Sequence, residues 1–366
     1  MALPRFHSLT VCRVDAEAAG AAAVTFQVPT DLRSRFVFIP GQFLTLQASI
    51  DGQNVRRSYS ICSTLSTYQK MGQLSVGIRP MQGGVFSTWA ALQIKAGDTL
   101  AVMPPEGRFV SDRPRALHRV GFAAGSGITP ILSVMATSLE EQPEAKFTLV
   151  YGNRSMASVM FNEALQDLKD RFADRLTLIH ILSRQAQEVD LLQGRIDAPK
   201  VQALIGTLLP AKSMDEVFIC GPEAMIESTE AALLAAGVPT RNIHTERFSS
   251  PTLDALPADK RRLAAQSRAP MASGAVSLTI TLDGKNHHLQ MEQDEHVLDV
   301  ALAAGLDLPY SCKAGVCCTC RAKVTSGTVH MDKNFTLEAW EVAKGFVLTC
   351  QARPTADNIA VNFDER

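Results

Sequence analysis

Five of the eight cysteines lie between residues 312 and 366, and their spacing suits iron–sulfur chemistry. Cys312, Cys317 and Cys320 follow the pattern C-x4-C-x2-C, and Cys350 lies further along the chain. Four thiolates at this spacing hold a [2Fe-2S] cluster of the plant type. A structural zinc ion is the alternative, but zinc is usually held by two closely spaced cysteine pairs, and here the fourth cysteine is isolated. We therefore predict a [2Fe-2S] site near the end of the chain.

Two motifs in the middle of the chain combine glycine with the expected start of a helix. Gly125-Ser126-Gly127 follows an apolar strand, so its backbone N–H groups could approach a pyrophosphate. Pro130 stands where the usual dinucleotide fingerprint has a third glycine, which makes this motif less specific alone. The run 220–222, Cys-Gly-Pro, forms a second strand-turn-helix signal, and the pair indicates a dinucleotide site.

A third set of residues suits a flavin. Arg57-Ser58-Tyr59-Ser60 lies on an expected strand, and the run 83–87, Gly-Gly-Val-Phe-Ser, opens an expected helix at residues 88–93. An arginine and a helix N-terminus suit phosphate, and the tyrosine offers a flat ring for a flavin or its ribityl chain. Each of these features is weak by itself, because R-x-Y-S occurs by chance in many strands.

The elements that must position these motifs divide the chain into three parts. The first part has short strands separated by Gly, Pro and Asp, at residues 24–28, 43–48, 57–62 and 74–78, which favours an antiparallel barrel. The middle part alternates strands, at residues 118–122, 147–151, 176–181 and 217–219, with helices such as 157–172, which is typical of a parallel sheet. The last part begins with a hairpin at Asp283-Gly284, followed by a helix at 297–304.

The composition is that of a soluble globular protein, with 46% apolar residues and a formal net charge of −1. Nucleic acid and acidic membranes both attract a surplus of Lys and Arg, so we expect neither as a partner. Residues 1–20 lack the unbroken apolar core of a secretion signal, which predicts a cytoplasmic protein. The uncharged run 120–139 contains several glycines and a proline, so we expect a buried strand, turn and helix there.

The motifs R-x-Y-S, G-S-G-I-T-P and C-G-P and the four cysteines, in this order, resemble the ferredoxin-NADP reductase superfamily fused to a plant-type [2Fe-2S] ferredoxin. The resemblance spans essentially the whole chain and implies a multidomain fold. We expect an FAD-binding antiparallel β-barrel at residues 1–112 and an NAD(P)-binding α/β domain with a parallel sheet at 113–248. A linker at 249–273 would precede an α+β, β-grasp ferredoxin domain at 274–366.

This resemblance also implies roles for single residues. Cys312 and Cys317 would hold one iron, Cys320 and Cys350 the other, and Cys318 would be the surplus thiol. The expected catalytic residues are Ser60, Cys220 and Glu246. The expected FAD contacts are Arg57, Ser58, Tyr59, Ser60 and Phe248, together with Gly84, Phe86 and Ser87 at the flavin pyrophosphate, which favours FAD over FMN. The expected nucleotide contacts are Gly125, Ser126, Gly127, Thr129, Cys220, Gly221 and Pro222.

The choice between NADPH and NADH depends on the end of the expected strand 147–151. A carboxylate there would bind the ribose hydroxyls of NADH and repel a 2′-phosphate, and none is present. Arg154 follows this strand, and Ser183 and Arg184 follow the next one, so cationic and hydroxyl groups could meet the phosphate. We therefore expect NADPH, with NADH as the less favoured nucleotide.

A narrower resemblance, to reductase subunits of phenylacetyl-CoA epoxidase complexes, is carried by residues 317–324, 331–332, 337–338, 340–341 and 345–351. It implies that electrons pass from NADPH through FAD and the cluster to a di-iron monooxygenase. A nicotinamide gives two electrons as hydride and a cluster accepts one at a time, and a flavin can do both. Two alternatives stay open: the reductase component of a Rieske-type aromatic-ring or ketosteroid hydroxylase, and a redox-sensing subunit.

The expected ferredoxin domain is more acidic than the rest of the chain. Residues 274–366 include 12 acidic and 8 basic side chains, a net charge of −4. Three acidic side chains, Glu292, Asp294 and Glu295, are the candidates for steering this domain toward a basic patch on the oxygenase.

Overall fold

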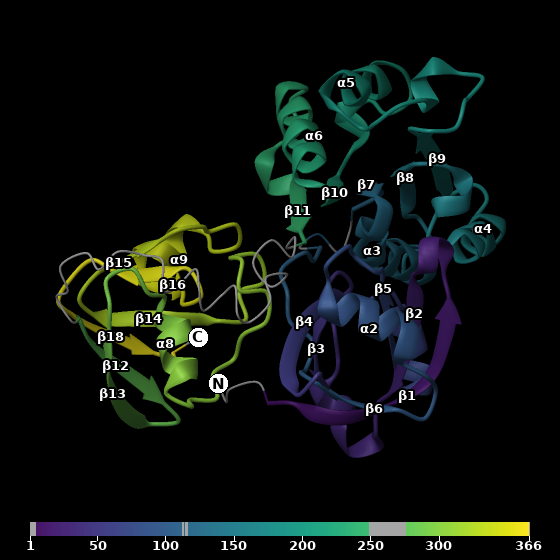
Figure 1. Cartoon of the computed structure of the whole chain (residues 1–366). Coiled ribbons are helices and arrows are strands. Elements are labelled where there is room, and N and C mark those ends of the chain that lie inside the picture. The colour runs from purple at the N-terminus through teal and green to yellow at the C-terminus, as the bar shows by residue number, and fades with distance from the viewer. Residues whose placement is uncertain (1–4, 112, 114–115, 249–275, 366) are drawn as a thin grey trace. The chain divides into compact units, whose positions relative to one another are not determined.

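The structure, a computed structural model, describes residues 5–111, 113, 116–248 and 276–365 (Figure 1). The chain divides into two compact units, a larger one made mainly of residues 8–50 and 59–248 and a smaller one centred on the C-terminal residues. The larger unit contains an antiparallel sheet and a parallel sheet. The expected linker at 249–273 lies outside the described residues.

The first sheet is antiparallel and has six strands in the order β4-β3-β6-β1-β2-β5. An isolated antiparallel β-bridge pairs Ile61, just after β4, with Val76 on β5. It brings the two edge strands together, so the sheet curls into a half-barrel. This confirms the predicted antiparallel barrel. The elements are β1 (His7–Ala16), β2 (Ala22–Gln27), β3 (Phe43–Ile50), β4 (Gln53–Ser60), α1 (Leu65–Met71), β5 (Gln73–Ile78), α2 (Val85–Gln93) and β6 (Thr99–Val102).

The second sheet has five parallel strands in the order β11-β10-β7-β8-β9. Successive residues of its central strand face opposite sides, because side chains alternate along a strand. Ala123 belongs to the core beneath α3 and α4, and Phe122 to the core beneath α5 and α6 (Figure 1). The elements are β7 (His118–Ala124), α3 (Ile128–Glu141), β8 (Lys146–Asn153), α4 (Asn162–Arg171), β9 (Leu176–Leu182), α5 (Ala198–Thr207), β10 (Glu216–Gly221), α6 (Glu223–Ala235) and β11 (Ile243–Arg247).

The alternation of strands and helices predicted for this part is confirmed, but one helix begins later than predicted. Phe161 has a left-handed backbone, with φ of 59°, which an α-helix does not accept. The segment 157–172 therefore splits into a short 3-10 turn at Met156–Ser158 and α4, which starts at Asn162.

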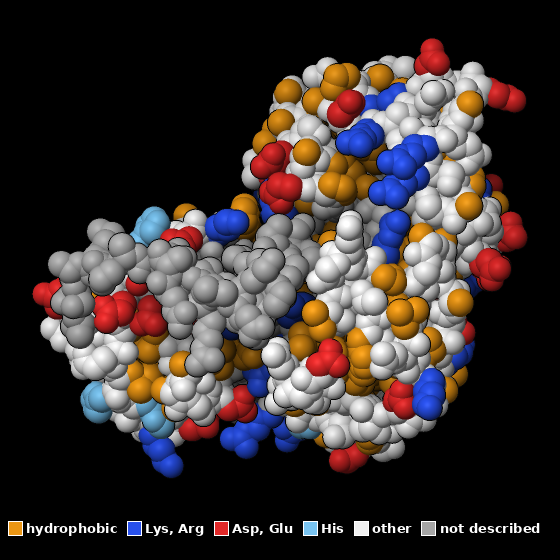
Figure 2. Space-filling view, viewed as in Figure 1, with side chains coloured by type: hydrophobic (Ala, Val, Ile, Leu, Met, Phe, Trp, Pro, Cys, Tyr) orange, Lys and Arg blue, Asp and Glu red, His pale blue; other side chains and the backbone are white. Residues whose placement is uncertain are grey.

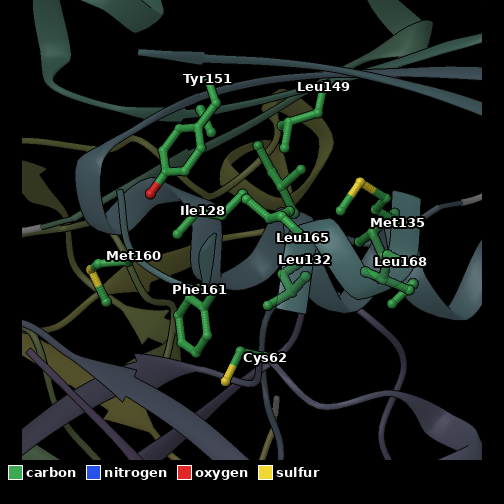
Figure 3. Close-up of a cluster of buried hydrophobic side chains, with 14 of the residues drawn as sticks. Cys62, Ile128, Leu132, Met135, Leu149, Tyr151, Met160, Phe161, Leu165 and Leu168 are labelled. Atoms are coloured by element: carbon green, nitrogen blue, oxygen red, sulfur yellow. The ribbon is translucent and has the colours of Figure 1, made fainter. Parts of the chain in front are cut away.

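The uncharged run 120–139 forms β7, a 3-10 turn at Gly125–Gly127 and α3, as predicted. Nearly every residue of α3 is buried, because this helix packs against both sheets of the larger unit (Figure 3). Its polar side chains also bind the segment that links β4 to α1: Ser133 Oγ donates to the Ser63 carbonyl at 2.7 Å, and Thr137 Oγ1 accepts from the Leu65 amide at 3.2 Å. Among the helices of the described ranges, none combines the length and apolar character needed to cross a bilayer.

The smaller unit is built on a five-stranded mixed sheet in the order β13-β12-β18-β14-β16, whose β12 and β18 are parallel. Asp283 and Gly284 both have positive φ, 49° and 71°, which the tight turn of the predicted hairpin requires. Helix α8 covers this sheet and buries Val297 and Ala301 (Figure 1). The elements are β12 (Val276–Leu282), β13 (Lys285–Met291), α8 (Val297–Ala303), β14 (Arg321–Ser326), β15 (Val329–Met331), α9 (Ala339–Ala343), β16 (Phe346–Leu348), β17 (Ala352–Pro354) and β18 (Asn358–Asn362), with β15 and β17 paired separately.

Candidate functional site

The loop between α8 and β14 carries three of the four predicted cluster ligands, and the fourth follows β16. Backbone and side-chain bonds join these distant segments. The amide and the hydroxyl of Thr349 both donate to the Cys320 carbonyl, at 3.2 and 2.9 Å. Gln351 Nε2 donates to the Lys313 carbonyl at 3.1 Å. Cys350, which lies between Thr349 and Gln351, is thereby held against the loop.

The four predicted ligands are close enough to affect one another's ionisation. The neighbouring Cys312 thiol and burial raise the pKa of Cys317 well above its ordinary value. For Cys350, interaction with Cys312 lowers the pKa, but interaction with Cys320 and burial outweigh it, and the pKa is raised. Such thiols stay protonated in the absence of metal and lose their protons when iron binds.

The backbone of the loop suits a cluster of sulfur ligands. The Ala314 amide donates to Cys312 Sγ at 3.4 Å, and such bonds stabilise the negative charge of coordinated thiolates. Gly315 has φ of 76°, and a Cβ at this position would lie 3.0 Å from the Lys333 carbonyl oxygen. Cys318, the surplus thiol, is half-buried. The donor set and the tight backbone fit a [2Fe-2S] cluster.

The three expected catalytic residues come together in the larger unit. Cys220 on β10 is paired with Glu246 on β11. Ser60, the last residue of β4, donates from Oγ to Glu246 Oε2 at 3.0 Å. Burial raises the pKa of Glu246 to about 8, so this carboxyl holds a proton at neutral pH. The Cys220 thiol is fully buried, and this burial raises its pKa well above its ordinary value. The nearby Glu246 carboxyl group raises the pKa further.

The two glycine-containing turns predicted to bind the dinucleotide also meet. A Cβ on Gly127 would lie 2.1 Å from the Cys220 carbonyl oxygen, so only glycine allows this approach. Gly125 has a left-handed backbone, with φ of 55°. Thr129 Oγ1 donates to the Ser126 carbonyl at 3.0 Å and so stabilises the turn itself. The second turn continues through Gly221 into Pro222, the N-cap residue of α6.

The expected flavin contacts lie on β4 and at the start of α2. The rings of Tyr59 and Phe86 are 5.7 Å apart between centroids. Ser87 Oγ accepts from the Met81 amide at 3.2 Å, and a Cβ on Gly84 would lie 2.5 Å from that oxygen. Helix α2 begins at Val85, three residues before the predicted start, so the Gly84 turn leads directly into its N-terminus. Arg57 and Ser58 lie beside Tyr59 on β4, and Phe248 is exposed just beyond β11.

The residues expected at the 2′-phosphate lie at the ends of neighbouring strands. The Ser183 amide donates to the Asn153 carbonyl at 2.9 Å, and the Arg184 amide donates to the Arg154 carbonyl at 2.8 Å. The side chains of Arg154, Ser183 and Arg184 are exposed, and Figure 2 shows Lys and Arg side chains gathered in a band over this part of the larger unit. The structure therefore places two guanidinium groups and a hydroxyl at adjacent strand ends.

One further residue of the nucleotide region is absent from the sequence prediction. Arg79 follows β5 and is half-buried, and its Nη1 lies 2.9 Å from the position that a Cβ on Gly125 would occupy. A cation beside the glycine turn suits a pyrophosphate. No signal in the sequence connects residue 79 with residue 125, because their proximity depends on the packing of α3 against the antiparallel sheet.

Three family models match the chain in the order of these sites. They describe an oxidoreductase FAD-binding domain at residues 10–110, an oxidoreductase NAD-binding domain at 122–231 and a 2Fe-2S iron-sulfur cluster binding domain at 280–355. The chain thus combines domains for FAD, for a nicotinamide nucleotide and for a 2Fe-2S cluster.

Known proteins resemble the chain along its full length. It is 44% identical to one of the subunits of 1,2-phenylacetyl-CoA epoxidase of Escherichia coli (strain K12), over 99% of this chain and 98% of that protein. It is 35% identical to the ferredoxin reductase component of 3-ketosteroid-9-alpha-monooxygenase of Rhodococcus rhodochrous, over 97% and 96%. Among solved structures, phthalate dioxygenase reductase has the same fold, with a TM-score of 0.59, 20% identity and 98% of both chains covered. The chain belongs to the family of flavin-dependent oxidoreductases that serve as reductase components of oxygenases and combine FAD-, NAD- and 2Fe-2S-binding domains.

Proposed function

We propose that the chain oxidises NADPH and delivers the electrons, one at a time, to the di-iron oxygenase component of a phenylacetyl-CoA epoxidase. The observation that carries this proposal is the 44% identity to a component of such an epoxidase over nearly the full length of both chains. FAD, when bound, accepts two electrons as hydride and releases them singly to a cluster.

In this proposal the residues of the chain bind, orient and supply protons. The Gly125 and Cys220 turns hold the nucleotide so that its nicotinamide reaches the Ser60 side of the larger unit. Glu246, protonated below about pH 8, holds a proton next to Ser60 Oγ. Cys312, Cys317, Cys320 and Cys350 hold the cluster. We also place the reaction in the cytoplasm, where thiols stay reduced.

The preference for NADPH rests on the exposed guanidinium groups at the ends of β8 and β9. We expect kcat/KM to be higher for NADPH than for NADH, and Arg154→Ala to lower the NADPH value selectively, since NADH has no 2′-phosphate. Steady-state kinetics with ferricyanide as acceptor measures both values without an oxygenase. An unchanged ratio in Arg154→Ala would remove this residue from the nucleotide site.

The partner is tested by reconstitution. The holoenzyme is mixed with the oxygenase components of a phenylacetyl-CoA epoxidase or, in a parallel reaction, of a ketosteroid hydroxylase, and product formed per NADPH consumed is measured. We expect tight coupling only with the epoxidase. Tight coupling only with the hydroxylase would favour the relatives that carry 35% identity. Slow transfer to every acceptor would favour a redox-sensing role and contradict the proposal.

A further inference from the structure

A tyrosine on the neighbouring strand β8 forms a hydrogen bond with the backbone of the turn between β7 and α3. Tyr151 lies on β8, and its side chain is fully buried. Its hydroxyl donates to the Gly125 carbonyl oxygen at 2.8 Å. In Figure 3 the Tyr151 hydroxyl points toward Ile128, the first residue of α3. The tyrosine therefore holds one defined peptide group of the turn.

The geometry of the peptide bond links this contact to the other face of the turn. All peptide bonds among the described residues are trans, and a trans peptide directs its C=O and its N–H in opposite directions. The carbonyl of Gly125 is directed toward Tyr151, inside the protein. The N–H of Ser126, in the same peptide group, is therefore directed away from Tyr151, as a donor for an anion at the start of the helix.

The next peptide group is held by a second side chain, which leaves the turn little freedom. Thr129 Oγ1 donates to the Ser126 carbonyl at 3.0 Å. The close approach of Gly127 to the Cys220 backbone restricts the turn from a third side. Of the side chains described around the turn, the Tyr151 hydroxyl is the one that binds the Gly125–Ser126 peptide, and it shares the Gly125 carbonyl oxygen with the Ile128 backbone N–H.

The Tyr151 hydroxyl is protonated and can therefore always donate this hydrogen bond. Burial raises its pKa well above the ordinary value, so the group keeps its proton throughout the working pH range. The ring belongs to an apolar core with Ile128, Met160 and Phe161, and this packing does not need a hydroxyl (Figure 3). A phenylalanine would fill the same space, so the oxygen atom itself calls for an explanation.

We propose that Tyr151 is a positioning residue that orients the Ser126 amide toward the pyrophosphate of the nicotinamide nucleotide. This inference rests on the nucleotide site of the proposed function and adds a residue that contacts the backbone of the turn and not the nucleotide. Both NADPH and NADH carry the pyrophosphate, so the effect does not depend on which of them is preferred.

The test compares Tyr151→Phe with the wild-type holoenzyme in NADPH- and NADH-dependent ferricyanide reduction. Loss of one hydrogen bond that orients a ligand-binding amide corresponds to about a fivefold change in affinity. We expect KM to rise about fivefold for both nucleotides, with an unchanged ratio of their kcat/KM values. Flavin reduction at saturating nucleotide should keep its rate within about twofold, because hydride transfer does not involve this hydroxyl.

Tyr68→Phe is the matched control, because it removes another buried tyrosine hydroxyl, which donates to the Arg33 carbonyl at 2.6 Å. It should lower the melting temperature about as much as Tyr151→Phe and leave both KM values unchanged. Unchanged KM values in Tyr151→Phe, or a fall in kcat at constant KM, would overturn the inference. Neither readout involves an oxygenase or the 2′-phosphate, so a failure here is distinguishable from failure of the proposed partner or nucleotide preference.

Discussion

The protonated carboxyl of Glu246 gives the most informative prediction about the larger unit. Glu246→Gln keeps an oxygen that can accept the hydrogen bond from Ser60 Oγ, but the new side chain cannot ionise. In the wild type, burial raises the pKa of Glu246 to about 8. In the unfolded chain the pKa of a glutamate is about 4.3. The two proteins should therefore differ in how their stability depends on pH.

The sign and size of this difference follow from proton linkage. Below about pH 4 the carboxyl is protonated in both states and contributes no difference. Between about pH 4.3 and 8 the unfolded chain is ionised while the folded chain keeps its proton, so the folded state loses stability as the pH rises. Each pH unit corresponds to about 1.36 kcal/mol, which sets an upper limit of about 5 kcal/mol. Because Glu246 is only half-buried, we expect about 2 kcal/mol.

Urea unfolding followed by flavin fluorescence, from pH 5 to 9 at constant FAD, measures this difference. Glu246→Gln should become more stable relative to the wild type as the pH rises, and the gain should level off above about pH 8. Glu188→Gln, the same change at an exposed carboxylate, is the matched control and should follow the wild type. Parallel pH profiles for Glu246→Gln and the wild type would show instead that Glu246 is ionised in the folded protein at neutral pH.

Three further changes test the nucleotide region and the approach of the oxygenase. Gly127→Ala brings a Cβ to 2.1 Å from the facing backbone, so we expect nucleotide affinity to fall by about tenfold or more in NADP+ titrations; wild-type affinity would contradict the contact. Arg79→Gln should raise KM about fivefold for NADPH and NADH alike, and an effect on NADPH alone would place Arg79 at the 2′-phosphate instead. Glu292→Lys, Asp294→Lys and Glu295→Lys, combined, should slow coupled epoxidation at low salt and leave ferricyanide reduction unchanged, and equal coupled rates across a salt series would reject steering.

Much of the cluster site could be predicted from sequence because its chemistry is local. Three of the four cysteines lie within nine residues of one another, and their spacing is set by the size of the cluster. The glycine turns were predictable for a similar reason, since each follows an apolar strand and opens a helix. The contact between the turns, in which Gly127 after β7 meets Cys220 on the adjacent strand β10, could not be predicted from the sequence.

The parts that sequence reasoning missed depend on packing between distant segments. Strand β1 buries few of its side chains, among them Leu9 and Val11, so its apolar alternation is too weak to predict a strand. The start of α4 was predicted too early, because a left-handed residue such as Phe161 has no signature in composition. Arg79 and Tyr151 reach the Gly125 turn from different strands, and no spacing rule in the chain relates these positions.

Whether electrons leave the chain through the cluster is tested by Cys350→Ser. The variant should lose the [2Fe-2S] centre but keep its flavin, because Cys350 is distant in sequence from the flavin-binding segments. NADPH should then reduce ferricyanide at the wild-type rate, while product formation by the reconstituted epoxidase falls to background. Cys318→Ser should keep its iron, its cluster spectrum and its coupled activity. Wild-type iron content in Cys350→Ser would rule out Cys350 as a ligand, and epoxidation by a variant that has lost its iron would rule out the cluster as the exit for electrons.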